Sequence, residues 1–282
     1  MKVLVTGSAG QLGFDVLREL TVRQIPCIGV DQADFDLTDG VAVHAGVKAV
    51  QPDVIVHCAA YTAVDRAESE PEVCAAVNGM GTMNMVRAAL DVGASLVYIS
   101  TDYVFPGTGE DPWQVDDNAG PLNVYGLSKL QGEMAVRSLM TRFFLIRTSW
   151  AFGLHGKNFV RTMLRLAGTR DSVSVVNDQF GSPTSTIELA KAVSVLMPTD
   201  NYGLFHATCE GSTDWASFTK EIFRIKGLPT EVIPISSEEY QKNNPASAVR
   251  PHYSILDNYM LRLTTDHVFA GWQEAIEEYL MA

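Results

Sequence analysis

Short runs of apolar residues alternate with longer amphipathic segments over the first half of the chain. The short runs, rich in Val and Ile, predict β-strands, and segments with apolar residues every three or four positions predict helices. The expected strands are residues 3–5, 25–30, 53–57 and 96–99, and the expected helices are residues 12–20, 41–50 and 71–92. This alternation predicts βαβ units and a parallel sheet covered by helices on both faces. The predicted fold class is α/β, a Rossmann-type doubly wound parallel sheet.

The alternation is less regular after a further apolar run at residues 144–148. The expected helices there are residues 158–167, 187–196 and 215–225, and the expected strands are residues 173–176, 204–206 and 231–233. No linker separates the two halves. We therefore expect a dinucleotide-binding Rossmann domain over residues 1–150, to which parts of the later chain return. Residues 151–282 are expected to form mainly a smaller C-terminal α/β substrate-binding lobe.

Composition excludes several other classes of protein. The formal net charge of −12 argues against nucleic acid as a partner, because phosphate binding needs a basic surface. No stretch of about 18 uncharged apolar residues is present, so no membrane-spanning segment is expected. The apolar run at the start is too brief for a signal peptide, which predicts a cytoplasmic protein. The four cysteines and six histidines are scattered, so neither a structural disulfide nor a metal cluster is expected.

Three glycines follow the first expected strand and precede the first expected helix. Gly7, Gly10 and Gly13 permit a tight turn, close approach of the backbone to a pyrophosphate and close helix–strand packing. The helix N-terminus adds unpaired N–H groups and a favourable dipole for an anion. The Gly-x-x-Gly-x-x-Gly spacing is a variant found in short-chain dehydrogenases. The alternative is a glycine-rich turn that binds no ligand.

Asp31 ends the second expected strand, where its carboxylate could accept hydrogen bonds from an adenosine ribose. That contact favours NADH, because a carboxylate repels the 2′-phosphate of NADPH and no Arg or Lys occurs in the next dozen residues. The alternative is a solvated acidic loop, since Asp34, Asp36 and Asp39 are close by.

Tyr125 and Lys129 are four positions apart, a spacing that puts both side chains on one helical face. A fixed cation there can lower the pKa of the phenol, normally about 10, and make it a usable proton donor or acceptor. A hydroxyl-rich segment, residues 100–105, follows the fourth expected strand. Together with the glycine turn, these residues indicate a nicotinamide-dependent enzyme.

The chain resembles the dTDP-4-dehydrorhamnose reductases of the extended short-chain dehydrogenase/reductase superfamily. The matching segments are residues 10–13, 59–70, 100–105, 121–129, 147–150, 177–184 and 250–251. The resemblance covers residues 1 to about 258. It implies reduction of the 4-keto group of dTDP-4-dehydro-L-rhamnose to dTDP-L-rhamnose with NADPH or NADH, for surface polysaccharide synthesis.

The same resemblance implies a role for each matching residue. Tyr125 would be the general acid, Lys129 would bind the nicotinamide ribose, and Thr101 would hydrogen-bond the reacting carbonyl. The implied cofactor-binding residues are Gly7, Gly10, Gln11, Leu12, Gly13, Asp31, Asp36, Leu37, Ala59, Ala60, Tyr61, Ser100, Tyr125 and Lys129. The implied substrate-binding residues are Thr101, Asp102, Tyr103, Trp150, Asn158 and Arg250. Core packing is the alternative for Trp150, and a surface ion pair is the alternative for Arg250.

Some family members bind Mg²⁺ at an acidic dimer interface, and Asp15 and Glu188 are the matching candidates here. A charged helix face explains both residues, so no metal is expected, and the resemblance leaves a homodimer open. Three other functions also remain open. A dehydratase would need a second carboxylate where Tyr103 follows Asp102. An epimerase would retain NAD⁺, and a regulatory subunit like that of methionine adenosyltransferase would catalyse nothing.

Overall fold

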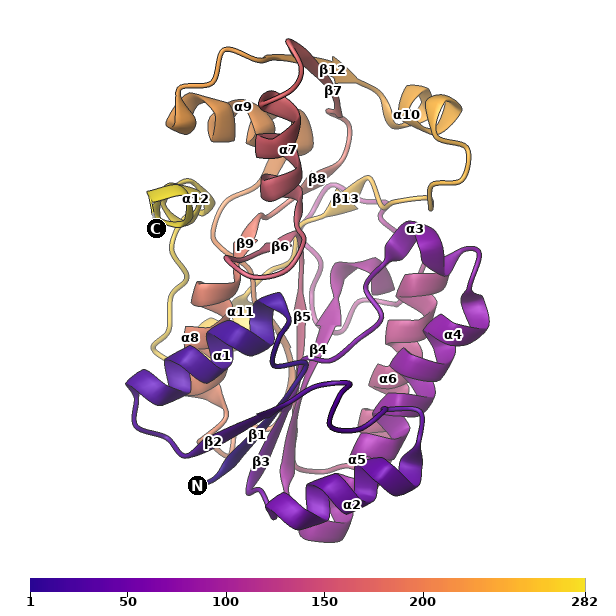
Figure 1. Cartoon of the computed structure of the whole chain (residues 1–282), viewed down its shortest axis with the longest axis vertical. Coiled ribbons are helices and arrows are strands. Elements are labelled where there is room, and N and C mark those ends of the chain that lie inside the picture. Colours follow the sequence, from indigo (N-terminus) through magenta and orange to yellow (C-terminus); the bar gives the residue numbers. More distant parts are fainter. Residues whose placement is uncertain (282) are drawn as a thin grey trace.

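The central element is a six-stranded sheet in which all neighbouring strands are parallel (Figure 1). The computed structural model describes residues 1–281. The strand order is β10-β5-β4-β3-β1-β2. In chain order the strands are β1 (Val3–Thr6), β2 (Cys27–Val30), β3 (Val54–His57), β4 (Ser95–Thr101), β5 (Phe143–Thr148) and β10 (Gly203–His206). The predicted doubly wound α/β fold is therefore confirmed.

Helices cover both faces of this sheet. One face carries α1 (Gln11–Val22) and α8 (Thr186–Leu196), and the other carries α2 (Gly40–Val50), α5 (Gly81–Val92) and α6 (Val124–Leu139). Successive side chains of β1 enter different cores: Val3 and Val5 pack on the α1 side, and Leu4 packs on the α2 side. Burial on both faces explains why the strands are continuous apolar runs rather than alternating patterns.

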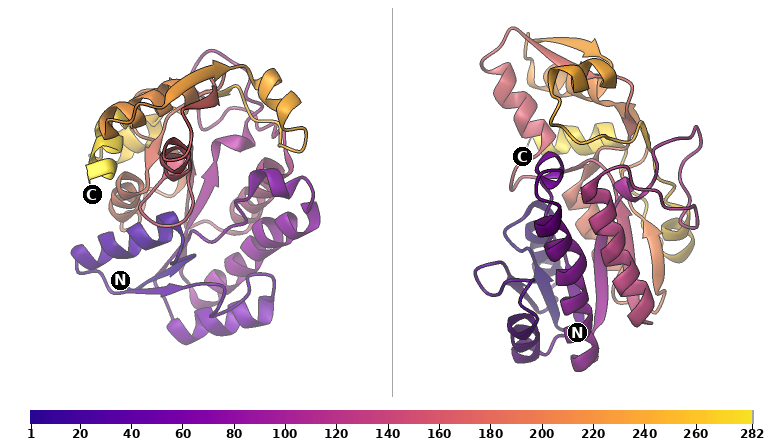
Figure 2. Two further views of the ribbon diagram at one scale, coloured as in Figure 1. Left: turned by 45° about the horizontal axis from the view of Figure 1, so that its top comes forward. Right: turned by 90° about the vertical axis from the view of Figure 1, so that its right-hand side faces the viewer.

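The strand order reverses between β1 and β3, which both leave the sheet at the same edge. Ligands of open α/β sheets bind outside the carboxyl ends of the strands at such a reversal. The smaller lobe lies at this end of the sheet (Figure 2). The fold therefore places a ligand site between the sheet edge and the lobe.

The helix predicted over residues 71–92 is confirmed, but it contains a π-helical turn that the sequence did not indicate. The structure has α4 (Pro71–Ala75), a π-helical turn (Ala76–Met80) and then α5. The turn carries Asn78, whose buried side-chain amide accepts from the N–H of Tyr61 (2.8 Å) and donates to its C=O (3.0 Å). This contact with the segment after β3 is tertiary, so helical periodicity gave no sign of it.

The smaller lobe contains short strands and helices drawn mainly from the second half of the chain. Its strands are β6 (Ala151–Phe152), β7 (Ser172–Val176), β8 (Phe180–Gly181), β9 (Thr184–Ser185), β11 (Thr213–Asp214), β12 (Glu231–Ile235) and β13 (Tyr253–Ser254). Its helices are α7 (Phe159–Ala167), α9 (Trp215–Lys226), α10 (Ser237–Asn243) and α12 (Trp272–Met281). They form sheets β11-β8-β13, β12-β7 and β6-β9.

Three late elements pack with the large sheet rather than with the smaller lobe. β10 pairs with β5, α8 packs on α1, and α11 (Tyr259–Thr264) packs on β10. One buried apolar cluster runs from Val3 in β1 to Leu280 in α12, so the two parts share a core. Among residues 1–281, no helix is both long and apolar enough to cross a bilayer.

Candidate active site

A cavity of about 1020 Å³ opens at the carboxyl edge of the sheet, beneath the smaller lobe. All fourteen predicted cofactor-binding residues line it, and so do four of the predicted substrate-binding residues: Thr101, Asp102, Tyr103 and Trp150. Asn158 and Arg250 are not among its lining residues. The structure therefore brings together most of the residues that sequence motifs had picked out across some 150 positions.

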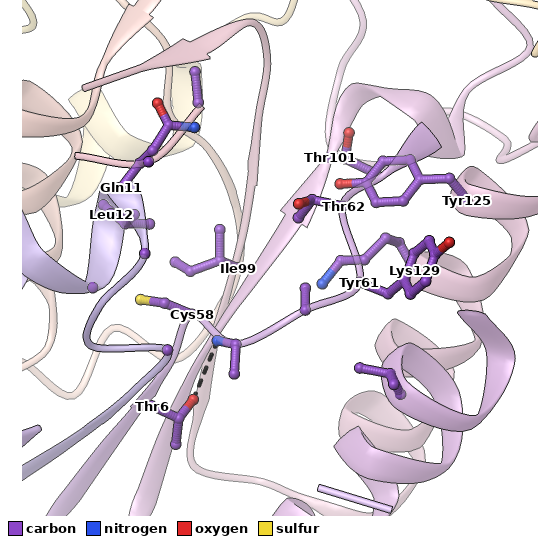
Figure 3. A pocket seen from close by; sticks show the side chains of 18 of the residues that line it. Thr6, Gln11, Leu12, Cys58, Tyr61, Thr62, Ile99, Thr101, Tyr125 and Lys129 are labelled. Atoms are coloured by element: carbon purple, nitrogen blue, oxygen red, sulfur yellow. Dashed lines mark hydrogen bonds between the residues drawn. The ribbon is translucent and has the colours of Figure 1, made fainter. Parts of the chain in front are cut away.

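The glycine turn closes tightly against the segment that follows β3. Gly7 has a φ of +66°, and a Cβ there would lie 2.7 Å from the N atom of Ala59. Gly10 donates its N–H to the C=O of Gly7 (2.9 Å), and α1 begins at the next residue. Ala59 donates its own N–H to the Thr6 hydroxyl (3.2 Å; dashed in Figure 3). These contacts leave the N-terminus of α1 open to the cavity, so the chain fits a dinucleotide pyrophosphate there.

Asp31 is held at the tip of this glycine turn. Its carboxylate accepts from the backbone N–H groups of Ala9 and Gln32, both at 2.8 Å. Asp34 in turn accepts from the N–H of Asp31 (2.8 Å). Asp36, also on the cavity wall, accepts from the N–H and hydroxyl of Thr38, and these hydrogen bonds lower its pKa. Asp31 and Asp36 therefore lie in a hydrogen-bonded segment at the cavity wall, and Asp34 and Asp36 are also exposed to solvent.

Thr101, Tyr125 and Lys129 converge from β4 and α6. Figure 3 shows the phenol of Tyr125 reaching the Thr101 hydroxyl, with the Lys129 amine pointing into the same space. Asn123 caps α6 by accepting from the N–H of Gly126 (2.8 Å). The helix therefore begins at Val124, one residue before Tyr125. Thr101 donates to the Asp102 carboxylate (3.0 Å) and accepts from the N–H of Tyr103 (3.2 Å).

The pKa values in this group differ from the sequence-based expectation. Burial raises the pKa of Tyr125, the charge of Asp102 adds to the rise, and the Thr101 hydroxyl opposes it. Burial also lowers the pKa of Lys129 to about 7. The expectation that the chain itself lowers the phenol's pKa through Lys129 is therefore wrong. Both groups are withdrawn from water, so desolvation favours the neutral form of each.

Trp150 and Asp102 occupy the end of the cavity beside the smaller lobe. Trp150 has a φ of +49° and stacks on Trp215 with ring centroids 3.5 Å apart. A side chain at Gly181 would overlap its indole ring. Asp102 is 2% exposed, and burial raises its pKa to about 6. The cavity wall thus includes an aromatic side chain and, beside Thr101, a carboxyl group that titrates near pH 6.

Asn158 and Arg250 make protein contacts instead of lining the cavity. Asn158 caps α7 by accepting from the N–H of Arg161 (2.9 Å), and its amide donates to Gln11 (3.0 Å) and to the C=O of Gly153 (2.7 Å). Arg250 pairs with Asp65 at 2.8 Å. Asn158 therefore supports the cavity residue Gln11, and Arg250 forms the ion pair that was its alternative.

Asp15 and Glu188 do not form a charged, solvent-facing helix surface, and that explanation is wrong. Asp15 is 1% exposed and accepts from the Thr186 hydroxyl (2.5 Å) where α1 packs on α8. Glu188 is also buried and binds Lys191 (2.6 Å) and the N–H of Ala270 (3.2 Å). Over the described part of the chain, no three His, Cys, Asp or Glu residues gather as a metal site.

Sequence reasoning missed several lining residues. Gly156 and Lys157, between β6 and α7, reach the cavity because Gly156 packs against the side chain of Gln11. The local sign of this turn in the sequence is the glycine itself, which has a φ of +72° in the structure. Cys58 also lines the cavity, and burial raises the pKa of its thiol to about 12, so it is an inert wall residue.

Known proteins share this arrangement over its full length. The family model described as RmlD substrate binding domain matches residues 1–282. A dTDP-4-dehydrorhamnose reductase of Streptomyces griseus is 40% identical over 98% of this chain and 91% of its own. Crystal structures named as that reductase, from Clostridium acetobutylicum and from Bacillus anthracis in complex with NADP, are 42% and 40% identical. Each has a TM-score of 0.95 and covers 100% of this chain and 99% of its own.

A doubly wound sheet, a glycine turn at its switch point and a Tyr-x-x-x-Lys pair facing the same cavity define an extended short-chain dehydrogenase/reductase. Within that class, the full-length match settles the family. The chain belongs to the RmlD substrate binding domain family.

Proposed function

We propose that this protein is an NAD(P)H-dependent oxidoreductase that reduces the 4-keto group of dTDP-4-dehydro-L-rhamnose to give dTDP-L-rhamnose. The observation that carries the proposal is the convergence of Thr101, Tyr125 and Lys129 on a cavity that also contains the glycine turn. The substrate comes from the names of full-length relatives about 40% identical to this chain. The product would serve surface polysaccharide synthesis.

The cofactor would occupy the half of the cavity bounded by the glycine turn, the acidic wall and the segment after β3. Bound there, NAD(P)H supplies the hydride for C4 of the sugar. Gly7, Gly10 and Gly13 accommodate the pyrophosphate at the N-terminus of α1. Lys129, whose amine points into the cavity, binds the nicotinamide ribose.

Asp31 would lie near the adenosine ribose. Its carboxylate is already anchored by the N–H groups of Ala9 and Gln32, so it cannot turn away from a 2′-phosphate without breaking both bonds. We therefore infer that NADH is used at least as well as NADPH. The NADP-bound relative from Bacillus anthracis supports use of the phosphorylated cofactor as well.

Tyr125 would donate the proton that completes the reduction. Its raised pKa keeps the phenol protonated at neutral pH, as a general acid requires before the step. The Thr101 hydroxyl, which donates to Asp102 in the resting protein, would turn to donate to the 4-keto oxygen as negative charge develops. The Lys129 ammonium then stabilises the phenolate left behind.

We infer that residues 1–150 bind the dinucleotide and that residues 151–282 contribute mainly to the substrate site. Ala151, Gly156 and Lys157 bring that part of the chain to the cavity, next to Trp150. Trp150 would stack against the sugar nucleotide, beside Asp102 and Tyr103. Asn158 and Arg250 would act on the substrate only through Gln11 and Tyr103, respectively.

The proposal also covers location and assembly. We infer a cytoplasmic enzyme, because the reaction consumes NAD(P)H. We infer a homodimer from apolar side chains left exposed on α6 and on the π-helical turn: Leu127 at 50%, Met134 at 60% and Met80 at 57%. Light scattering at micromolar concentration should give twice the monomer mass, and a monomer that is unaffected by Met134→Glu would refute this assignment.

The direct test supplies dTDP-4-dehydro-L-rhamnose with NADH or NADPH, follows the loss of absorbance and identifies the product sugar. Stoichiometric production of dTDP-L-rhamnose and oxidised cofactor is expected. An epimerase would instead keep NAD⁺ bound through purification and consume no NAD(P)H. A dehydratase would leave the 4-keto group in place, and a regulatory subunit would give no turnover with any nucleotide sugar.

A further inference from the structure

Glu133 lies one helical turn beyond Lys129 on α6 and continues the row formed by Tyr125 and Lys129. It is 0% exposed and does not line the cavity. Its carboxylate accepts from the Ser100 hydroxyl (2.6 Å), from Nε of Arg147 (2.9 Å) and from Nη2 of Arg147 (2.7 Å). Three hydrogen bonds from the chain, two of them from one guanidinium, therefore hold this carboxylate in place.

These hydrogen bonds connect the catalytic helix to the two strands beside it. Ser100 immediately precedes Thr101 at the end of β4, and it pairs across the sheet with Arg147 of β5. Arg147 is 2% exposed and lies over the Phe105 ring, with its guanidinium carbon 4.8 Å from the ring centroid. Glu133 therefore joins the helix that carries Tyr125 and Lys129 to the strand that carries Thr101.

The groups that surround the buried amine of Lys129 differ in how they act on its charge. On β3 and the segment after it lie His57, which is neutral because burial lowers its pKa to about 3, and Cys58. Tyr98 of β4 presents its ring face 4.2 Å from the amine, Cys74 lies on α4, and Tyr125 is on the same helix. Desolvation lowers the pKa of Lys129, whereas the charge of Glu133 acts most strongly to raise it, with smaller effects of the same sign from Cys58 and Cys74.

Two explanations of the Glu133–Arg147 pair make different predictions. A pair that only stabilises the fold would lower stability when broken and leave the protonation of Lys129 unchanged. A pair that also serves the site would change both, because Glu133 is the member of the pair whose charge acts on Lys129. Glu133 lies on the same face of α6 as Lys129, and it accepts a hydrogen bond from Ser100, the neighbour of Thr101 on β4. This placement favours the second explanation.

We propose that Glu133 is a positioning residue of the active site: it holds the Tyr125–Lys129 helix against the Thr101 strand and supplies a negative charge that favours the ammonium form of Lys129. The catalytic consequence rests on the proposed reductase function. The effect on Lys129 itself does not, so the two can be tested separately.

The first test measures Lys129 without turnover. NMR of the full chain with ¹³C-labelled lysine, in which the Lys129 signal is identified by its loss in Lys129→Met, would follow its titration. In Glu133→Gln, which keeps the shape but removes the charge, the midpoint should fall by about one pH unit. Glu188→Gln is the matched control, because Glu188 is also a buried carboxylate paired with a lysine, Lys191, outside this site. It should leave the Lys129 midpoint unchanged.

Glu133→Gln leaves Arg147 buried without its partner, so this variant can fail to fold. The double variant Glu133→Gln/Arg147→Met removes the pair together and keeps the core neutral. It should fold and show the same downward shift of the Lys129 midpoint. A midpoint within 0.3 units of the parent protein in the folded variants would overturn the proposal.

The second test uses the pH dependence of turnover. If the midpoint moves from about 7 to about 6, the protonated fraction of Lys129 falls about tenfold at pH 8 and less than twofold at pH 6. Turnover by the variant relative to the parent should follow these ratios. An equal loss at both pH values would mean that Glu133 acts only on structure and would overturn the catalytic part. Absence of turnover in the parent protein would refute the reductase function but leave the NMR result standing.

Discussion

Replacement of Tyr125 by Phe tests the proton donor with little other change. The ring and its edge-to-face contact with Tyr103, at a centroid distance of 5.5 Å, are kept, and only the hydroxyl facing Thr101 is lost. General acid catalysis contributes about 10²–10⁴-fold, which corresponds to about 2.7–5.5 kcal/mol of activation free energy. Turnover with dTDP-4-dehydro-L-rhamnose should fall by that factor.

The same variant should bind the cofactor almost as well as the parent protein, because the glycine turn and Lys129 are untouched. Cofactor affinity is measured by fluorescence titration, and turnover by the loss of NAD(P)H absorbance under saturating substrate. Tyr259→Phe is the matched control: Tyr259 is 53% exposed at the start of α11 and lies outside the cavity lining. The control should retain full activity.

Loss of activity has a structural explanation that must be separated from the chemical one. Thermal unfolding should show that Tyr125→Phe is folded, with an unfolding free energy within about 1 kcal/mol of the parent. Turnover by this folded variant within about threefold of the parent would refute the assignment. A barrier change below about 1 kcal/mol is too small for loss of the proton donor.

Three further changes address the cofactor site and Lys129. Gly7→Ala should abolish cofactor binding in a fluorescence titration, because its Cβ would meet the backbone of Ala59 and the left-handed φ would be strained; normal affinity in this variant would contradict the placement of the pyrophosphate. Asp31→Ala should raise the ratio of NADPH to NADH use in steady-state kinetics, whereas a strong NADPH preference already present in the parent and unchanged by the substitution would remove Asp31 from the account. For Lys129, the folded pKa of about 7 lies below the unfolded value, so the unfolded chain binds more protons between about pH 7 and 10. The unfolding free energy of the parent, relative to that of Lys129→Met, should therefore rise over that pH range in urea titrations. If the unfolding free energies of the two proteins change with pH in parallel, the pKa of Lys129 is not lowered in the folded protein.

Local sequence patterns determined the framework of this protein. Apolar runs of three to six residues separated by amphipathic segments predicted the parallel sheet and its covering helices, because burial on both faces demands such runs. The glycine spacing and the Tyr125–Lys129 spacing are local as well, and the carboxyl ends of parallel strands gather such residues at one edge. Every predicted cofactor residue accordingly lines one cavity.

Tertiary structure decided what depends on partners distant in the chain. The expected helix over residues 71–92 contains a π turn, and the side-chain amide of Asn78 in that turn binds the backbone of Tyr61. The side-chain amide of Asn158 donates hydrogen bonds to Gln11 and to the backbone of Gly153 instead of lining the cavity. Burial raises the pKa of Tyr125, whereas its spacing from Lys129 along the helix had led us to expect a lower value. Spacing along a helix specifies which side chains share a face, but the number of water molecules and charges around each one is set only when the rest of the chain packs against that face.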